Sequence, residues 1–316
     1  MLFFTSLTDV PADFGPSAVT IGKFDGLHTG HRSVLRAVRD AAQTAGLTST
    51  VLTFDRNPLS VLAPERCPDA LVSNDQKREL LADAGIEATA MLHFDRAFSK
   101  RLPEQFVQDI LVDTLHARVV FVGADFKFGA RGAGNVALLQ RLGRSLGFRL
   151  SVVDAMSLDG TNRVSATGIR QLLARGDVAA AARLLGRLHA VRGPVIRGEQ
   201  RGRTLGFPTA NLSPRLEGFI PADGVYAGWL TVNGEKLPAA ISVGNNPTFD
   251  GVPERQVEAH VLDRDVDLYD KTVEVSFVSR IRGMEKFDGV EALVAQIGRD
   301  VSQVRALLPG ATNRQR

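Results

Sequence analysis

The chain has 316 residues, 44% of them apolar, which is enough for two domains that each bury a core. Its formal net charge of +3 and pI near 9.2 suit anionic small substrates, and the absence of a long lysine-rich run argues against a nucleic-acid partner. One cysteine, Cys67, excludes an internal disulfide, and no apolar run is long enough to span a bilayer. The N-terminal run lacks a basic segment, so no signal peptide is expected and the sequence predicts a cytoplasmic protein without a membrane partner.

Apolar runs alternate with amphipathic stretches from about residue 17 to residue 185. The stretches 32–45 and 76–84 have the helical period. Predicted strands fall at residues 18–21, 49–54, 90–94, 119–122 and 150–153. This βαβα order predicts a doubly wound, mostly parallel sheet, in which ligands bind at the carboxyl ends of the strands.

The loop after the first predicted strand, GKFDGLHTGHR, is a candidate phosphate site. It holds His28 and His31, two of only six histidines, and Gly30 between them allows close approach of the backbone. At a strand-to-helix turn, helix N-terminal amides favour phosphate. Imidazoles fixed there can donate hydrogen bonds to a transferring nucleotide and stabilise the charge that develops.

The stretch RVSATGIRQLL, residues 163–173, is a second candidate phosphate site. Ser165 and Thr167 are expected before a helix, where their hydroxyls can cap it or bind phosphate. Arg170 falls in the first turns and can bind phosphate oxygens through two N–H groups. A capped surface helix with a solvated arginine is the alternative interpretation. Upstream, Asn135 is expected to cap the helix that follows RGAGN.

The stretch RGRTLGFPTANL, residues 201–212, marks the change to the second half. Gly202 and Gly206 allow the backbone to approach a bound group. Thr209 and Asn211 share one face if the chain leaves the turn extended. A hydroxyl and an amide in that arrangement suit phosphate and Mg²⁺, although the residues alone also fit a tight hairpin with a polar exit.

The second half changes to short strands and turns, which predicts an antiparallel barrel. The predicted strands are residues 224–232, 237–244, 256–263 and 271–279, and a helix is expected at 290–308. In the third of these strands Glu258 and His260 lie on the face opposite the apolar residues. Taken alone, a glutamate there is as readily a solvated surface residue.

Several of these motifs point to one family. GFPTANL, preceded by Gly193, Val195 and Gly198, resembles the riboflavin kinase signature, and FDGLHTGH resembles the flavin adenylyltransferase version of the HxGH signature. With TFDRNP, GADFKFG, RVSATGIRQLL, ISVGNNPTF and VEAHVLD in order, the chain apart from its ends resembles the prokaryotic bifunctional riboflavin kinase and FAD synthetase family. The resemblance implies an α/β plus β fold. Residues 1–186 would form a Rossmann-like nucleotidyltransferase domain, and 187–316 a riboflavin kinase β-barrel with a C-terminal helix.

The resemblance also implies the reactions and their residues. The second domain would phosphorylate riboflavin to FMN with ATP and Mg²⁺, and the first would adenylylate FMN to FAD and release diphosphate. Glu258, His28 and His31 would be catalytic, and Thr209 and Asn211 would bind Mg²⁺. The ATP- or phosphate-binding residues would be Gly22, Phe24, Asp25, Gly26, Gly30, Ser165, Thr167, Arg170, Gly202, Gly206, Thr209 and Asn211. The flavin-binding residues would be Asn57, Asp125, Phe126, Phe128, Arg282 and Phe287, with Asn246 and Phe249 shaping a pocket; Phe126 and Phe128 suit core packing equally well.

Departures from the family pattern leave alternatives open. Arg56 and Asn57 stand where the family usually has proline and histidine, and Ala166 replaces a serine. A riboflavin kinase with a weakened or lost adenylyltransferase activity is therefore one alternative. A flavin- or nucleotide-binding regulator without turnover is another, and a nucleic-acid-binding protein is suggested by the pI alone. The sequence does not decide between a monomer and a weak homo-oligomer.

Overall fold

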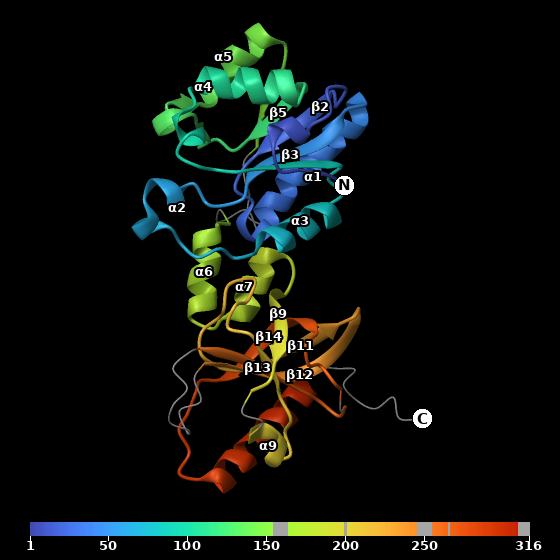
Figure 1. Cartoon of the computed structure of the whole chain (residues 1–316), viewed down its shortest axis with the longest axis vertical. Helices are drawn as coiled ribbons and strands as arrows, with labels where there is room; N and C mark the ends of the chain where they lie inside the picture. The colour runs from blue at the N-terminus through green and yellow to red at the C-terminus, as the bar shows by residue number, and fades with distance from the viewer. Residues whose placement is uncertain (154–163, 199–200, 245–254, 265, 309–316) are drawn as a thin grey trace. The chain divides into compact units, whose positions relative to one another are not determined.

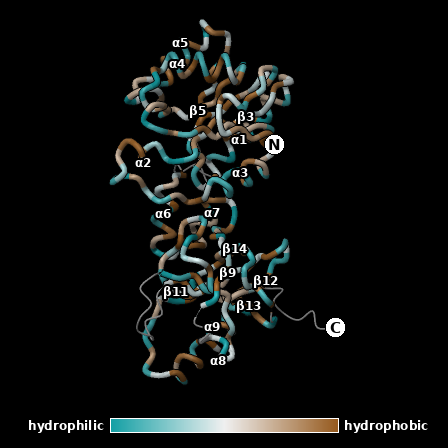
Figure 2. The backbone as a smooth tube through the Cα atoms, in the orientation of Figure 1, coloured by the Kyte–Doolittle hydropathy of each residue, from teal (hydrophilic) through white to brown (hydrophobic). Residues whose placement is uncertain are grey.

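A computed structural model describes residues 1–153, 164–198, 201–244, 255–264 and 266–308 of the chain (Figure 1). The chain divides into two compact units, Met1–Ser165 and Ala166–Arg316. Apolar and hydrophilic residues alternate along the backbone of both units (Figure 2), as expected where each element turns one face to a core. Among the helices in the described ranges, none has the length and apolar character needed to cross a membrane.

The first unit is built on a six-stranded sheet in the order β1-β4-β3-β2-β5-β8, and every neighbouring pair is parallel. The strands are β1 (Leu2–Phe4), β2 (Ser17–Ile21), β3 (Thr48–Phe54), β4 (Ala88–Leu92), β5 (Ala117–Val122) and β8 (Arg149–Val152). The predicted parallel sheet is confirmed. The edge strand β1 was not predicted, and β4 begins and ends two residues before the predicted range.

Helical segments connect these strands. The longer ones are α1 (Thr29–Ala45), α3 (Asn74–Asp83), the π-helix η5 (Phe106–Thr114) that continues α4 (Pro103–Gln105), and α5 (Val136–Leu146). The shorter ones are η1 (Leu7–Asp9), η2 (Asp25–Leu27), α2 (Leu59–Leu62), η3 (Pro64–Arg66), η4 (Phe98–Lys100) and η6 (Ala130–Gly132), and a small hairpin pairs β6 (Lys127–Phe128) with β7 (Gly134–Asn135). Asn135 caps α5 as predicted, because its side chain accepts a hydrogen bond from the Leu138 N–H at 2.9 Å.

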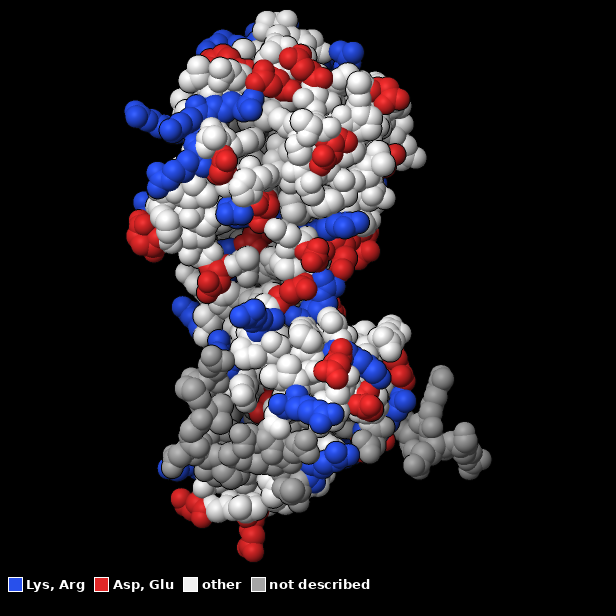
Figure 3. Space-filling model, in the orientation of Figure 1, with Lys and Arg blue, Asp and Glu red and all other residues white. Residues whose placement is uncertain are grey.

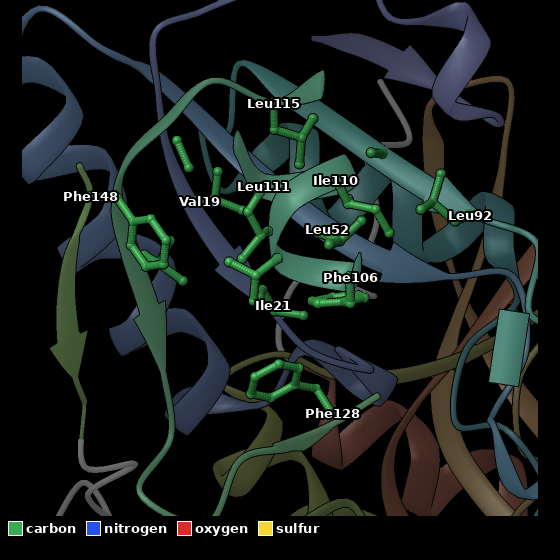
Figure 4. Packing of buried hydrophobic residues seen from close by; sticks show 14 of the residues in the cluster. Val19, Ile21, Leu52, Leu92, Phe106, Ile110, Leu111, Leu115, Phe128 and Phe148 are labelled. Atoms are coloured by element: carbon green, nitrogen blue, oxygen red, sulfur yellow. The ribbon is translucent and has the colours of Figure 1, made fainter. Parts of the chain in front are cut away.

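Apolar side chains are buried on both faces of this sheet. On one face Val19 and Ile21 of β2 pack with Leu111 of η5 and with Phe128 (Figure 4). On the other face Ala18, the neighbour of Val19, packs with Val38 and Ala42 of α1. Because successive strand residues point to opposite faces, these two clusters show that the sheet is covered on both sides, as a doubly wound fold requires.

The second unit is a closed barrel in the order β10-β13-β12-β11-β14-β9, with antiparallel neighbours throughout. Its strands are β9 (His189–Ile196), β10 (Ala210–Leu212), β11 (Gly224–Val232), β12 (Glu235–Gly244), β13 (Gln256–Val261) and β14 (Thr272–Arg282). A tight hairpin turn joins β11 and β12, where Asn233 and Gly234 adopt φ of 50° and 79°. The barrel prediction is confirmed; β9 was not predicted as a strand.

Four helices complete the second unit: α6 (Ala166–Ala174), α7 (Val178–Leu185), α8 (Arg201–Thr204) and α9 (Val290–Leu307). The C-terminal helix α9 confirms the helix expected at 290–308, and it buries Val301 and Val304 against Ala227 and Leu262. Helix α7 packs against β9 and β14, and α6 packs against α7. Hydrogen bonds join this pair to the barrel, from the Ala222 N–H to the Leu173 carbonyl and from Arg280 to the Arg175 carbonyl.

His189 is a buried titratable residue of the barrel. It is 2% exposed, its Nε2 donates to the Phe219 carbonyl at 2.5 Å, and its ring stacks on Phe277. Burial lowers the pKa of His189 from 6.5 to about 4; the hydrogen bond to Phe219 opposes this change and the charge of Arg187 adds to it. The imidazole is therefore neutral in the folded barrel at pH 7.

The second unit is expected to lose stability as the pH falls from about 6.5 to about 4, because unfolded His189 takes up a proton that the folded residue does not. Below both pKa values the loss should reach about 3 kcal/mol. Urea unfolding at pH 7 and pH 5, followed by the fluorescence of the single tryptophan, Trp229 in β11, measures it. His189→Gln should show a weaker pH dependence, and an unchanged dependence in that variant would contradict the assignment.

Candidate active sites

The first candidate site lies where β2 ends and α1 begins. The helix starts at Thr29, three residues before the predicted start, so His31 is in its first turn and His28 is the N-cap. The Nδ1 atom of His28 accepts a hydrogen bond from the His31 N–H at 3.3 Å. An accepting Nδ1 places the proton of a neutral imidazole on Nε2, which makes Nε2 the hydrogen-bond donor of His28.

The two imidazoles are packed together. The rings of His28 and His31 stack with centroids 3.7 Å apart, and the Phe24 ring lies 5.1 Å from His31. Burial, aided by the charges of His28 and Lys77, lowers the pKa of His31 well below its usual range. The Nδ1 atom of His31 is buried and has no hydrogen-bond partner among the described residues. The site therefore presents a neutral His31 that has a buried polar atom without a partner.

Two of the predicted phosphate-binding residues, Phe24 and Asp25, anchor the loop between β2 and α1 to the rest of the unit. Phe24 is 2% exposed and packs in a core cluster with Leu27 and Leu35. The Asp25 carboxylate accepts a hydrogen bond from the Leu71 N–H at 2.8 Å. Gly26 has φ of 75°, a conformation that favours glycine. The side chains of Phe24 and Asp25 thus fix the shape of the loop that carries Gly22, Gly26, Gly30 and both histidines.

The TFDRNP loop follows β3 and contains a compact charged cluster. Asp55 forms an ion pair with Arg56 at 3.0 Å and accepts hydrogen bonds from Nδ1 of His93 at 2.7 Å and from the Phe94 N–H at 3.0 Å. Burial alone would raise the pKa of Asp55, but these hydrogen bonds outweigh burial and lower it. His93 comes from the end of β4, so the structure brings an imidazole to the loop in which Asn57 replaces the family's histidine.

The predicted flavin-binding residues of the first unit lie on two segments. The side-chain oxygen of Asn57 accepts from the Leu59 N–H at 3.1 Å, which supports the start of α2. Asp125 is exposed in the loop after β5. Phe128 is buried in the main core cluster, and Phe126, which is partly buried, stacks on it at 5.4 Å. Of the two aromatic rings, Phe126 is the one that keeps exposed area for a ligand.

The RVSATGIRQLL motif is divided between the two units. Ser165 is the last residue of the first unit and is exposed, whereas Thr167 and Arg170 belong to α6 of the second unit. Because α6 begins at Ala166, Thr167 lies in its first turn instead of before it, which corrects the expected helix start. Arg163 lies outside the described residues, as do Asn246 and Phe249.

The second candidate site is built where β10 pairs with β13. Asn211 and Glu258 are direct cross-strand partners, and Oγ1 of Thr209 donates to Oε2 of Glu258 at 3.2 Å. Thr209 and Asn211 are partly exposed while Ala210 and Leu212 are buried, so the expected common face is confirmed. The structure therefore brings Thr209 and Asn211 next to Glu258, which is 49 positions after Thr209 in the sequence.

A cavity of about 420 Å³ adjoins this cluster. Thr209 and Asn211 line it together with two cations, Arg203 and Arg264, and the apolar and aromatic side chains of Leu268 and Tyr269. A cavity with hydroxyl and amide groups, cations and a flat aromatic side chain suits a nucleotide or another phosphate-bearing aromatic ligand. On the face of the molecule visible in Figure 3, basic and acidic side chains occur together, in keeping with a net charge of only +3.

Two glycines let the backbone approach this cluster. A Cβ atom at Gly198 would lie 2.6 Å from Cγ of Asn211, and one at Gly202 would lie 2.4 Å from the Phe207 carbonyl oxygen. Gly206 has φ of 85°, which favours glycine for a different reason. The Nδ1 atom of the nearby His260 donates a hydrogen bond to the Pro208 carbonyl at 2.8 Å and so supports the GFPTANL turn.

The donor set of this cluster fits Mg²⁺. The Thr209 hydroxyl donates a hydrogen bond to Glu258, which leaves the lone pairs of the hydroxyl oxygen able to bind a cation. The amide nitrogen of Asn211 donates to the Thr209 carbonyl at 3.4 Å, which leaves the amide oxygen as the cation ligand. Mg²⁺ prefers such oxygen ligands and is usually held by one or two side chains together with substrate phosphates.

The two predicted flavin-binding residues near the C-terminus contact each other. The Arg282 guanidinium lies 5.6 Å from the centre of the Phe287 ring and forms an ion pair with the buried Asp300 of α9 at 2.8 Å. Arg282 is thus held between β14, where it is the last residue, and α9. Its guanidinium fixes the position of the Phe287 ring in the segment between these two elements.

Two polar residues that lie near the first site, His93 and Lys77, were not predicted as site residues. His93 falls inside the strand predicted at residues 90–94. The available signal was that polar residues follow two apolar runs, Asp55 after one and His93 within the end of the other, as at the carboxyl ends of neighbouring strands. Lys77 was included in a predicted helix without comment. The signal there was its spacing from Leu80 and Leu81, because a residue three and four positions before two apolar residues lies on the same helix face as they do.

Comparisons with known proteins give matches in both halves of the chain. A family model described as FAD synthetase matches residues 10–168, and one described as riboflavin kinase matches residues 185–308. The chain is 37% identical over 283 residues to the bifunctional riboflavin kinase/FMN adenylyltransferase of Escherichia coli (strain K12), covering 89% of this chain and 90% of that protein. It is 35% identical over 289 residues to the protein of the same description from Listeria monocytogenes, covering 91% of each. A crystal structure described as a macrolide-efflux protein from Streptococcus pneumoniae superposes with a TM-score of 0.84 at 31% identity, over 96% of this chain and 98% of that one.

Proposed function

The chain belongs to the family of bifunctional riboflavin kinases/FMN adenylyltransferases, and we propose that its two candidate sites divide the two reactions between them. The chain phosphorylates riboflavin with ATP to give FMN and ADP, and it adenylylates FMN with a second ATP to give FAD and diphosphate. Residues 1–186 form the adenylyltransferase module and residues 187–316 the kinase module. Both steps consume ATP, and we place the enzyme in the cytoplasm.

The kinase step is assigned to the cluster of Thr209, Asn211 and Glu258. The observation that carries this assignment is the 3.2 Å hydrogen bond from Thr209 to Glu258 beside the 420 Å³ cavity. Glu258 orients the primary hydroxyl of riboflavin and accepts its proton as the oxygen attacks the γ-phosphorus of ATP. The bond from that phosphorus to the bridging oxygen breaks, and its electron pair leaves with ADP.

Thr209 and Asn211 are the residues proposed to hold Mg²⁺ in the kinase step. When bound, the ion neutralises the negative charge of the ATP phosphates. Arg203 and Arg264 line the same cavity together with one carboxylate, Asp267, so its wall carries more positive than negative side chains. The protein thus contributes mainly by positioning the phosphates and the attacking hydroxyl.

The adenylyl step is assigned to His28 and His31, with Ser165, Thr167 and Arg170 as further phosphate-binding residues. The Nε2–H is the donor group of His28 because its Nδ1 accepts from the His31 N–H. Directed at the ATP phosphates, this group stabilises charge that builds on the α-phosphorus and on the leaving diphosphate. The FMN phosphate oxygen is the nucleophile. The proposed flavin contacts in this module are Asn57, Asp125, Phe126 and Phe128.

Gly198→Ala is expected to slow FMN formation about tenfold or more, since a Cβ there would lie 2.6 Å from Asn211 and displace its amide. FAD formation from supplied FMN should not change, because the substitution lies in the other module. Steady-state rates of both steps on one preparation measure the difference. Equal slowing of both steps would show that the variant disturbs the whole chain and not the Asn211 position.

Two separate assays test the assignment of both activities. The purified chain with riboflavin, ATP and Mg²⁺ should release ADP, and with FMN, ATP and Mg²⁺ it should release diphosphate, each followed by a coupled enzyme. ADP release without diphosphate release would leave a riboflavin kinase alone. ATP binding with neither release would refute the enzyme assignment and favour a flavin- or nucleotide-binding regulator.

A further inference from the structure

Lys77 is a buried lysine at the corner of the sheet where the adenylyl step is placed. It is the fourth residue of α3, is only 7% exposed, and its Nζ donates to the carbonyl of Phe54, the last residue of β3, at 3.1 Å. Side chains of a helix lean toward its N-terminus, so the first turn of α3 directs Lys77 to the carboxyl edge of the sheet. This is the edge at which β2 ends and the histidine loop begins.

The start of α3 is fixed at this edge by several hydrogen bonds. Ser73 and Gln76 form a capping box, and the Asn74 side chain donates to the Asp55 carbonyl at 2.8 Å. Helix α3 also packs against η2 of the histidine loop, and the preceding Leu71 N–H donates to Asp25. Lys77 is therefore held in a rigid position between the TFDRNP loop and the histidine loop.

The charge of Lys77 is not matched by a carboxylate. Within the described part of the chain, no ion pair involves Nζ, and its one hydrogen bond goes to a neutral carbonyl. Asp25 and Asp55 attract it from a greater distance, but burial outweighs them and lowers the pKa of Lys77. A buried cation without a close anion is unfavourable, because the ammonium has lost its hydration and gained no opposite charge. Its presence indicates an anion that the chain itself does not supply.

Within the described ranges, His31 adds a second polar group without a partner at the same corner of the sheet. Its Nδ1 is buried and unpaired among the described residues, and the charge of Lys77 is close enough to lower the pKa of His31. The neutral imidazole of His31 and the ammonium of Lys77, both held in position, form an anion site that loses little entropy on binding. Of the three N–H groups of an ammonium, one is used by Phe54, which leaves two for phosphate oxygens.

We propose that Lys77 is a phosphate-binding residue of the adenylyl-transfer site, where its ammonium contacts the ATP phosphates and the diphosphate that leaves. The proposal rests on the adenylyltransferase function proposed above and adds a residue to it. A phosphate oxygen of FMN forms a bond to the α-phosphorus of ATP, and the bond from that phosphorus to the β-bridging oxygen breaks. The electron pair of the broken bond goes to diphosphate, whose added charge Lys77 offsets.

The test compares Lys77→Met, which removes the charge at similar length, with Lys77→Arg, which keeps it. Lys100→Met is the matched control, because it removes the same charge from an exposed position of the same unit. Lys77→Met should reduce kcat/KM for FAD formation about 10²-fold and weaken Mg²⁺-diphosphate binding in calorimetry by tenfold or more, as expected for loss of one charged donor. Lys77→Arg should retain more of both than Lys77→Met, and Lys100→Met should retain both in full.

FMN formation from riboflavin in each variant reports whether the second unit is still folded, and FAD formation retained by Lys77→Arg reports that the first unit tolerates substitution at this position. Diphosphate binding does not need turnover, so it separates this inference from the proposed function. If the wild-type chain makes no FAD but binds diphosphate more tightly than Lys77→Met does, the adenylyltransferase function is refuted and the phosphate-binding role of Lys77 is supported. Slower FAD formation with unchanged diphosphate affinity would overturn the inference and leave Lys77 with a structural role only.

A measurement on the wild-type chain applies if Lys77→Met does not fold. Lysines are acetylated with acetic anhydride with and without Mg²⁺-diphosphate, and the extent at each lysine is read by mass spectrometry. Diphosphate should protect Lys77 severalfold and leave Lys236, a lysine of the barrel unit, unchanged. Equal acetylation of Lys77 with and without saturating diphosphate would overturn the proposal.

Discussion

Glu258→Gln is expected to reduce FMN formation from riboflavin by about 10²- to 10⁴-fold, the usual contribution of a general base. Glutamine preserves the size of the side chain and can still accept the hydrogen bond from Thr209, but it cannot accept the proton of the riboflavin hydroxyl. The loss should therefore appear in kcat, with a smaller change in KM for ATP. Chromatographic rates of FMN formation measure it.

The same preparation supplies the control for this variant. FAD formation from supplied FMN should proceed at the wild-type rate, because Glu258 lies in the second unit. Glu291→Gln removes an equal charge from the exposed first turn of α9 and should leave both reactions unchanged. A Glu258→Gln enzyme that forms FMN within threefold of the wild-type rate would exclude Glu258 as the base.

His28→Asn is expected to reduce FAD formation about 10²- to 10³-fold, as for removal of one oxyanion donor. Asparagine is among the best N-cap residues, so its side-chain oxygen can replace Nδ1 of His28 as the acceptor for the His31 N–H. The substitution thus keeps the helix start and removes the Nε2 donor. Steady-state formation of FAD from FMN and ATP measures the effect.

The comparison with His28→Ala separates capping from catalysis. Alanine removes both the donor and the cap, which should lower the stability of the first unit by about 1 kcal/mol. Thermal unfolding should therefore distinguish the two variants while their FAD-forming rates are similarly low. Wild-type FAD formation in His28→Asn would show that the histidine acts only as a helix cap.

The sequence predicted the parts of the fold that have a clear period. The buried runs of β2, β3 and β5 and the alternating strands β11 and β13 lie within a residue or two of their predicted ranges at most ends. The edge strand β1 was missed because three residues are too few to show a period. The end of β4 was placed too late because Phe94 is apolar and buried although it lies in a loop.

The kinase cluster could be predicted because sequence alternation alone puts Thr209 and Asn211 on one face and Glu258 on a face of its own strand. Their pairing depends on the register of β10 and β13, which no short-range pattern specifies. Lys77 and His93 show the opposite case. Each contacts the residues at the end of β3 only because α3 and β4 bring it there, a tertiary arrangement that the sequence pattern did not reveal.

The assignment of α6 illustrates the same limit. Its RVSATGIRQLL motif predicts a role in the adenylyl step, whereas the helix packs with α7, which packs on the barrel. The FAD synthetase model ends at residue 168, inside α6, and the riboflavin kinase model begins at residue 185, the last residue of α7. The motif therefore assigns α6 to the adenylyltransferase module, whereas packing places α6 and α7 with the barrel unit. We keep the proposed functional boundary between residues 186 and 187.

The most direct test is one chromatographic time course of the purified chain with riboflavin, ATP and Mg²⁺. We expect FMN to appear first and FAD to follow at its expense, with one ATP used at each step. That order would establish both activities on one chain and show that the Arg56 and Asn57 substitutions are compatible with adenylyl transfer. FMN that accumulates without FAD would contradict the bifunctional assignment and leave the chain a riboflavin kinase.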